Sequence, residues 1–224
     1  MLFRSKELID SGKLGEIQHI SITYNNFVRR WDWQTLQSRV AGSLYNTGPH
    51  PVGMALGFLD YDANAELKFS RLSNALGSGD AEDYAKLIIT APGRAVVDIE
   101  INPTDAFPGV HLKVCGTRGT FKTDMRSYEM KYIIDGENPE RPVVFGSLKN
   151  ENGDPTYCSE TLITHEESGS FDGTAFDIGT AELYEMLYKA ITEDAPMSVN
   201  AEMAAGVIKI IERAHAENPM PVLF

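Results

Sequence analysis

Apolar and polar residues alternate along much of the chain between residues 16 and 134. In residues 16–27, Ile20, Ile22 and Tyr24 alternate with polar neighbours, and this period of two predicts a strand with one buried face. The Pro92–Gly93 pair separates two such segments and predicts a hairpin turn. The further segments with strand character are residues 65–73, 83–91, 94–102, 110–116, 119–124 and 127–134.

Helical patterns flank these strands. Residues 2–11 predict a short helix, residues 51–59 a second, and residues 180–192 a third. A fourth begins after Asn200, a good N-cap residue, whereas residues 136–173 are polar and irregular. This order predicts an α+β fold, with an open, mainly antiparallel sheet and helices on one face, in a single domain over residues 1–224.

Charge and cysteine content narrow the class of protein. The formal net charge of −12 disfavours binding to nucleic acid or to an anionic membrane surface. Cys115 and Cys158, without a secretory signal, suggest a reducing compartment, and no run reaches the ~20 apolar residues of a membrane span. We therefore expect a cytoplasmic protein.

Residues 165–167, His-Glu-Glu, are expected to be solvated surface.

Nucleotide and metal motifs are absent from the sequence. GSGDAED, residues 77–83, has half of a G-x-G-x-x-G pattern but precedes a predicted strand instead of a helix. CGTRGTF, residues 115–121, places its glycines at a turn between strands. His111 and Cys115 could share one strand face, but two ligands without a third do not predict a metal site.

SLYNTGPHPVGMAL, residues 43–56, holds His50 between two prolines where a helical pattern begins. A helix N-terminus disfavours the imidazolium, and a neutral imidazole can accept a proton from a hydroxyl group in alcohol oxidation. Gly48 permits a ligand to approach the backbone, and Asn46 could orient a substrate hydroxyl. The alternative is that His50 only caps a helix.

VRRWDWQT, residues 28–35, gathers aromatic and cationic side chains. Trp31 and Trp33 could stack on a sugar ring, and Arg29 or Arg30 could bind a hydroxyl or a carboxylate. The alternative is that the tryptophans pack a loop and the arginines are solvated.

AGSLYNTGPHPVGMALGFL, residues 41–59, resembles the signature of the second domain of the Gfo/Idh/MocA oxidoreductases, the glucose–fructose oxidoreductase and inositol dehydrogenase family. That signature is a Gly-rich lead, D-x-G-x-H and a helix. Further stretches resemble the family in the same order along the chain: residues 7–26, 82–102, 114–124 and 198–214.

The resemblance implies specific roles. In this family an N-terminal Rossmann domain binds NAD or NADP, and the second domain supplies the substrate pocket and subunit contacts. His50 matches the proposed acid/base histidine. Asn46 stands where the family has an aspartate, so it can orient a hydroxyl but cannot take a proton. Gly53 stands where an aspartate often closes the motif.

The function expected from the resemblance is that of a substrate-binding and oligomerisation domain of an NAD(P)-dependent sugar or polyol dehydrogenase. His50 is the catalytic residue, and Asn46, Arg29, Trp31 and Trp33 are substrate contacts. NAD or NADP is expected in the full-length enzyme, with no cofactor or metal on this chain alone. A homodimer or tetramer would form through the open sheet face. The alternatives are a stand-alone ligand-binding or scaffold module, or one chain of a split dehydrogenase.

Overall fold

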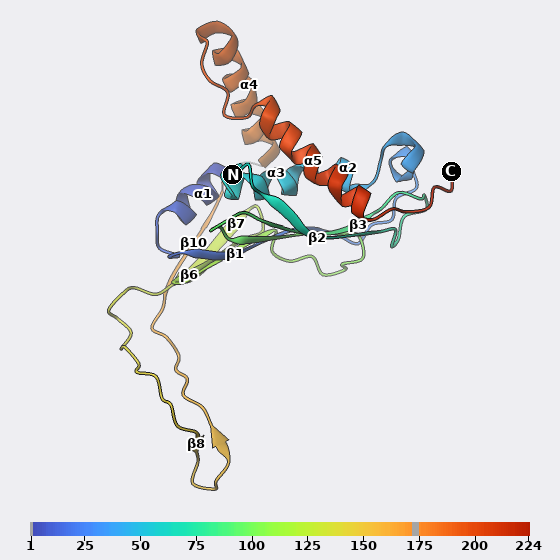
Figure 1. Ribbon diagram of the computed structural model, residues 1–224. Coiled ribbons are helices and arrows are strands. Elements are labelled where there is room, and N and C mark those ends of the chain that lie inside the picture. Colours follow the sequence, from blue (N-terminus) through green and yellow to red (C-terminus); the bar gives the residue numbers. More distant parts are fainter. Residues whose placement is uncertain (1, 172–174) are drawn as a thin grey trace.

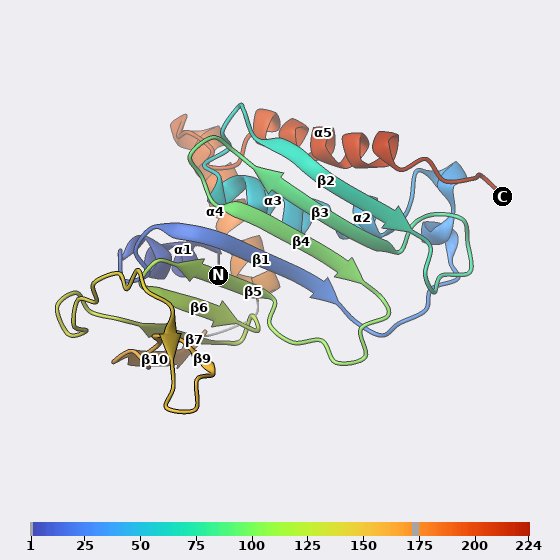
Figure 2. The same cartoon turned by 60° about the horizontal axis from the view of Figure 1, so that its bottom comes forward.

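An eight-stranded sheet is the frame of the protein in the computed structural model, which describes residues 2–171 and 175–224 (Figure 2). The strands lie in the order β10-β7-β6-β5-β1-β4-β3-β2. Their bounds are β1 Ile17–Asn25, β2 Glu66–Ser73, β3 Tyr84–Thr90, β4 Val96–Asn102, β5 Leu112–Gly116, β6 Gly119–Thr123, β7 Ser127–Tyr132 and β10 His165–Ser170. The α+β prediction is confirmed.

One parallel pair interrupts an otherwise antiparallel sheet. β1 lies at the centre, parallel to β4 and antiparallel to β5, with Ile22 opposite Ile99 on one side and Leu112 on the other. The chain leaves β1, crosses one face through helices, and returns through β2 and β3. The ends of β1 and β4 therefore point the same way, and the loops that follow them lie together.

Helices cover one face of this sheet. Their bounds are α1 Leu2–Asp10, α2 Ser43–Asn46, α3 Pro49–Phe58, α4 Ala175–Glu193 and α5 Ala201–Glu217. Figures 1 and 2 show α1, α3 and α5 on the same side. The period of two puts Val97, Ile99 and Ile101 of β4 into the core beneath them, where α5 adds Ile211 and Ala214.

The uncovered face is polar and holds its own ion pairs. Lys86 of β3 reaches Asp98 at 2.6 Å and Glu100 at 3.1 Å, both on β4. Burial alone would lower the pKa of Lys86, but hydrogen bonds to both carboxylates outweigh it and raise that pKa. The lysine is therefore charged on this face.

Three segments differ from the sequence-based prediction. α2 forms at residues 43–46, where no helix was predicted, because Glu82 caps it from a distant loop. The His165–Glu167 run lies in edge strand β10, paired with β7, and not in irregular surface; Glu167 binds Lys13 at 2.5 Å. Only cross-strand contacts reveal this strand, since its own sequence is polar.

α4 begins at residue 175, five residues earlier than predicted, and Figure 1 shows it extending away from the sheet. Its apolar side chains are largely exposed: Leu183, Tyr184, Leu187, Tyr188 and Ile191. The helical spacing was therefore correct as a helix signal, but it does not mark core in this chain.

Residues 136–164 form a long arm that Figure 1 shows projecting on the side of the sheet opposite the helices. Its tip carries the short strands β8 Leu148–Lys149 and β9 Pro155–Thr156. Arg141 and Glu160 form an ion pair across it, 2.6 Å apart. The prediction of an irregular segment holds for most of this arm.

Two neighbouring valines of β4 test the assignment of faces. Val97 is 0% exposed and Val96 is 39% exposed. We expect Val97→Ala to lower the free energy of unfolding by about 2 kcal/mol, because it removes buried methyl groups and leaves a cavity. Val96→Ala, the matched control, should change it by less than about 0.5 kcal/mol. Urea unfolding measures both, and equal losses would contradict the assignment.

Candidate functional site

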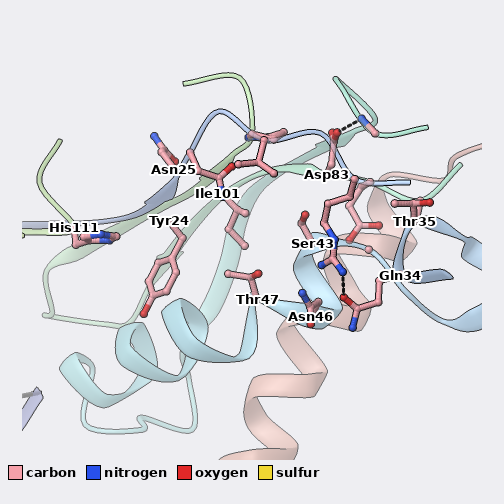
Figure 3. Close-up of a pocket in the computed structure, with 18 residues that line it drawn as sticks. Tyr24, Asn25, Gln34, Thr35, Ser43, Asn46, Thr47, Asp83, Ile101 and His111 are labelled. Carbon is pink, nitrogen blue, oxygen red and sulfur yellow. Dashed lines mark hydrogen bonds between the residues drawn. The ribbon is translucent and has the colours of Figure 1, made fainter. Parts of the chain in front are cut away.

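A cavity of about 240 Å³ opens where β1 and β4 end, beside α2 (Figure 3). This volume is just below the ~300–1,000 Å³ of pockets that take drug-sized ligands, so it suits a small molecule. The residues that line it are Tyr24, Asn25, Asn26, Val28, Arg30, Gln34, Thr35, Gly42, Ser43, Asn46, Thr47, Gly77, Ala81, Glu82, Asp83, Ile101, Pro103 and His111.

Glu82 builds the wall of the cavity formed by α2. Its side chain is 2% exposed, and its Oε1 accepts the Leu44 N–H at 2.8 Å, while its main-chain oxygen accepts the Ser43 N–H at 2.8 Å. These two bonds satisfy N–H groups that a helix start leaves free. At Gly42, where φ is +132°, a Cβ would lie 2.2 Å from both Glu82 carboxylate oxygens, so only glycine fits.

His215 of α5 partners the same carboxylate. Its Nε2 lies 3.3 Å from Glu82 Oε2, its Nδ1 donates to the Ile211 carbonyl at 2.9 Å, and its ring stacks on Tyr45, 4.3 Å between centroids. Burial by itself would lower the pKa of His215. The nearby Glu82 carboxylate and the Ile211 carbonyl outweigh that effect and raise the pKa. The buried charge of Glu82 is thus balanced.

Asp83 closes the loop on the other side of the cavity. Its Oδ1 accepts the Ala75 N–H at 2.6 Å, and its Oδ2 accepts those of Leu76 at 2.8 Å and Gly77 at 2.5 Å. A carboxylate with three backbone donors is already satisfied. Asp83 therefore holds the loop and leaves little capacity for a ligand.

Arg30 in the cavity wall is also bound by neighbouring side chains. Arg30 donates to Asp32 Oδ2 from Nη2 at 2.8 Å and from Nε at 3.2 Å, and it also contacts Gln34 Oε1. The Arg30 guanidinium and the Gln34 N–H lower the pKa of Asp32, which stays ionised. The charged groups named so far in the cavity wall are therefore paired or hydrogen-bonded within the protein.

At the end of the cavity away from Arg30, the Tyr24 ring contacts two histidine rings. Tyr24 lies parallel to His50, with centroids 6.4 Å apart, and edge-on to His111, with centroids 5.7 Å apart. Burial raises the pKa of Tyr24, and its hydroxyl lies 3.7 Å from the Met54 sulfur, so Tyr24 is a neutral ring that contacts both imidazoles.

The residues predicted from the sequence are only partly brought together. Asn46 lines the cavity, and His50 is exposed and stacked on a lining residue without lining the cavity itself. Trp31 and Trp33 are 76% and 60% exposed and stand outside its walls, as does Arg29. Their contact with a substrate stays a prediction.

Gly48 also has a packing role. A Cβ there would lie 2.1 Å from the Leu44 carbonyl oxygen, within the tight turn between α2 and α3. Packing of this turn requires the glycine, and the approach of a ligand to its backbone stays a prediction.

Sequence reasoning missed several lining residues, chiefly Gly42, Glu82, Asp83 and His111. The signal available was the group of three acidic residues, Asp80, Glu82 and Asp83, just before an apolar strand. His111 was considered only as a metal ligand. Within residues 2–171 and 175–224, no group of three or more His, Cys, Asp and Glu side chains is placed to hold a metal ion.

The described residues do not fit a dinucleotide. Such sites place a glycine-rich turn between a strand and a helix, whereas the glycines of residues 77–79 join β2 to β3. A Cβ at Gly79 would lie 1.9 Å from the Thr35 carbonyl oxygen, so this glycine allows close packing against the protein's own backbone.

None of the helices described here is both long and apolar enough to cross a membrane.

Comparisons with known proteins agree with this architecture. Residues 4–122 match the family model described as the GFO/IDH/MocA C-terminal domain. An oxidoreductase from Bacillus cereus has the same fold, with 18% identity, a TM-score of 0.68 and 98% of this chain covered. An NAD-binding protein from Listeria innocua also has this fold, with 19% identity, a TM-score of 0.68 and 97% of this chain covered. The chain spans 61% of each of these two proteins. No curated protein sequence matches it.

The cap at α2 gives a stability test. Gly42→Ala should lower the free energy of unfolding by about 1–3 kcal/mol, because it forces a side chain into a strained backbone and against Glu82. Gly53→Ala is the control: its Cβ would meet nothing closer than 3.8 Å, and alanine is the better helix former. Urea unfolding of both variants checks this; a harmless Gly42→Ala would contradict the described cap.

The His215–Glu82 pair predicts how stability changes with pH. The pKa of His215 is raised in the folded protein, so the pair stabilises fully below the unfolded pKa of about 6.5. That contribution is lost as pH rises through the folded pKa. His215→Gln should flatten the fall in stability across this window, whereas His19→Gln, on the uncovered face, should retain it. Unfolding by urea at a series of pH values measures the slope.

Proposed function

Because the chain belongs to the GFO/IDH/MocA C-terminal domain family, we propose that it is the substrate-binding domain of an NAD(P)-dependent oxidoreductase. Its substrate would be a sugar, a polyol or a related hydroxy compound. The observation that carries the proposal is the cavity beside the SLYNTGPHP stretch, which offers hydrogen-bonding groups but no unpaired charge among its described acidic and basic residues.

The chemistry of the wall favours a neutral, hydroxyl-bearing ligand. A carboxylate or phosphate substrate needs a free cation, and Arg30 is held by Asp32. An ammonium substrate needs a free carboxylate, and both Glu82 and Asp83 are already bonded within the protein. Hydroxyl groups both donate and accept, so they can bind the amides, hydroxyls and carbonyls that remain.

His50 is the proposed acid/base group. It lies in the first turn of α3, and its ring packs on Tyr24 of the cavity wall. A neutral imidazole there can take the proton of a substrate hydroxyl as that hydroxyl is oxidised. Asn46, exposed at the cavity, would orient the hydroxyl.

The nicotinamide would have to come from outside the described residues, since these do not fit a dinucleotide. The solved relatives are longer than this chain, and one of them is called an NAD-binding protein. A separate nucleotide-binding chain is the split-enzyme alternative. A stand-alone ligand-binding module is the second candidate.

We also propose that two copies associate through the uncovered sheet face. Phe69 is 47% exposed and Val96 39% exposed, and both lie on the strands of this sheet. The arm of residues 136–164 projects on the same side of the sheet (Figure 1). A second copy would cover this surface with an equivalent one.

The mass of the native polypeptide in its source cells separates the candidates. Immunoblotting and intact mass spectrometry with an antibody to this domain should find a species well above 24.8 kDa if the domain belongs to a longer dehydrogenase. A species of 24.8 kDa that fails to bind NADH would favour the stand-alone module, and one that becomes active with a second chain would favour the split enzyme.

In the active protein, His50→Ala should lower kcat for oxidation of the substrate hydroxyl by about 10²–10⁴-fold, because the proton acceptor is lost. His19→Ala is the matched control, since His19 lies on β1 facing away from the helices. Steady-state kinetics and circular dichroism measure activity and folding together. Full activity of a folded His50→Ala protein would rule out the catalytic assignment.

A further inference from the structure

We propose that His111 is a second substrate-contacting histidine, which accepts a hydrogen bond from a substrate hydroxyl at Nε2. This inference rests on the proposed function and adds a residue to the same cavity. His111 precedes β5, lines the cavity and extends its ring toward Tyr24 in Figure 3. The family signature, residues 41–59, does not include it.

The protein's own contacts decide which ring nitrogen carries the proton. His111 Nδ1 lies 2.8 Å from the main-chain oxygen of Thr23. A carbonyl oxygen can only accept, so Nδ1 must be the donor, and the neutral ring then carries its lone pair on Nε2. Among the described residues, Nε2 has no hydrogen-bond partner. The neutral ring thus presents an unused acceptor.

Anchoring of β5 to β1 does not by itself require a histidine. The Thr23 N–H already donates to the His111 carbonyl at 2.8 Å, and the Thr23 hydroxyl donates to the Val110 carbonyl at 2.5 Å. These bonds use the backbone of residues 110 and 111. The imidazole adds one hydrogen bond through Nδ1, and Nε2 is not used in this anchoring.

Asn25 lines the cavity but turns its amide toward Glu100 on the uncovered face of the sheet. Its Nδ2 donates to Glu100 and to Asp105, each at 3.1 Å, so the amide nitrogen must face these carboxylates. Its Oδ1 is buried and has no partner among the described residues. A buried acceptor without a donor costs free energy. Because this oxygen is closed to solvent, His111 and not Asn25 offers the acceptor that a ligand can reach.

An acceptor at Nε2 of His111 selects for a donor group on the ligand. His50 and His111 both lie against the Tyr24 ring, one stacked on it and the other edge-on to it. A compound with several hydroxyls could donate to His111 with one of them while another faces His50. This geometry favours a polyol over a simple alcohol.

The experiment is NMR spectroscopy of the chain labelled with ¹⁵N-histidine, at a pH where the ring is neutral. Long-range ¹H–¹⁵N spectra identify the nitrogen that lacks a proton. The probes are myo-inositol, glucose and glycerol, titrated in turn. The variants are His111→Asn, whose amide nitrogen can keep the donor to Thr23 but whose shorter side chain has no acceptor at the position of Nε2, and His19→Asn as control.

We expect the unprotonated signal to come from Nε2 of His111 and to move when a polyol binds. Loss of one hydrogen bond in His111→Asn should weaken polyol binding about 2- to 12-fold, and His19→Asn should leave it unchanged. If His111→Asn does not fold, the Nε2 signal of the unsubstituted protein still shows whether this nitrogen lacks a proton and responds to the polyol.

Two results would overturn the inference and leave the proposed function standing. One is a proton on Nε2. The other is a polyol that shifts the Asn46 and Thr47 amides while the Nε2 signal stays in place and His111→Asn binds equally well. If no probe shifts these amides or His111, the proposed substrate class fails, and the assignment of His111 fails with it.

Discussion

The buried carboxylate of Glu82 joins the three segments on which the cavity depends. It caps α2 through Leu44, requires glycine at position 42 and contacts His215 on α5. Taking a charge out of water is costly unless it is paired and hydrogen-bonded, and here the cap and the imidazole together meet that condition. The loop before β3, the short helix α2 and the last helix are therefore held in one arrangement.

This arrangement brings the candidate chemistry to one place. The parallel pairing of β1 with β4 puts Tyr24 and Ile101 at the same end of the sheet. Glu82 then brings α2 against that end, so that Asn46 joins the wall, and α3 follows with His50 beside Tyr24. The proposed acid/base group thus has its position because a buried ion pair fixes the helix before it.

The cavity also shows why charged residues near a site need not bind a charged ligand. Arg30 and Asp83 both line the wall, yet an aspartate and three backbone N–H groups already satisfy them. Charges that are paired within the protein shape the wall and leave neutral groups, such as the Asn46 amide, for a ligand. The proposal of a neutral hydroxy compound rests on this distinction.

The sequence by itself determined the α+β class, the strands from β1 to β7 and the place of α3 and α5, because local alternation and helical spacing report which side chains are buried. It also placed His50 at the start of a helix. Only the tertiary structure decided that α2 exists, that polar β10 pairs with β7, that the stripe of α4 is exposed, and that Glu82 and His111 reach the cavity. These features depend on contacts between segments far apart in the chain, which no local pattern contains.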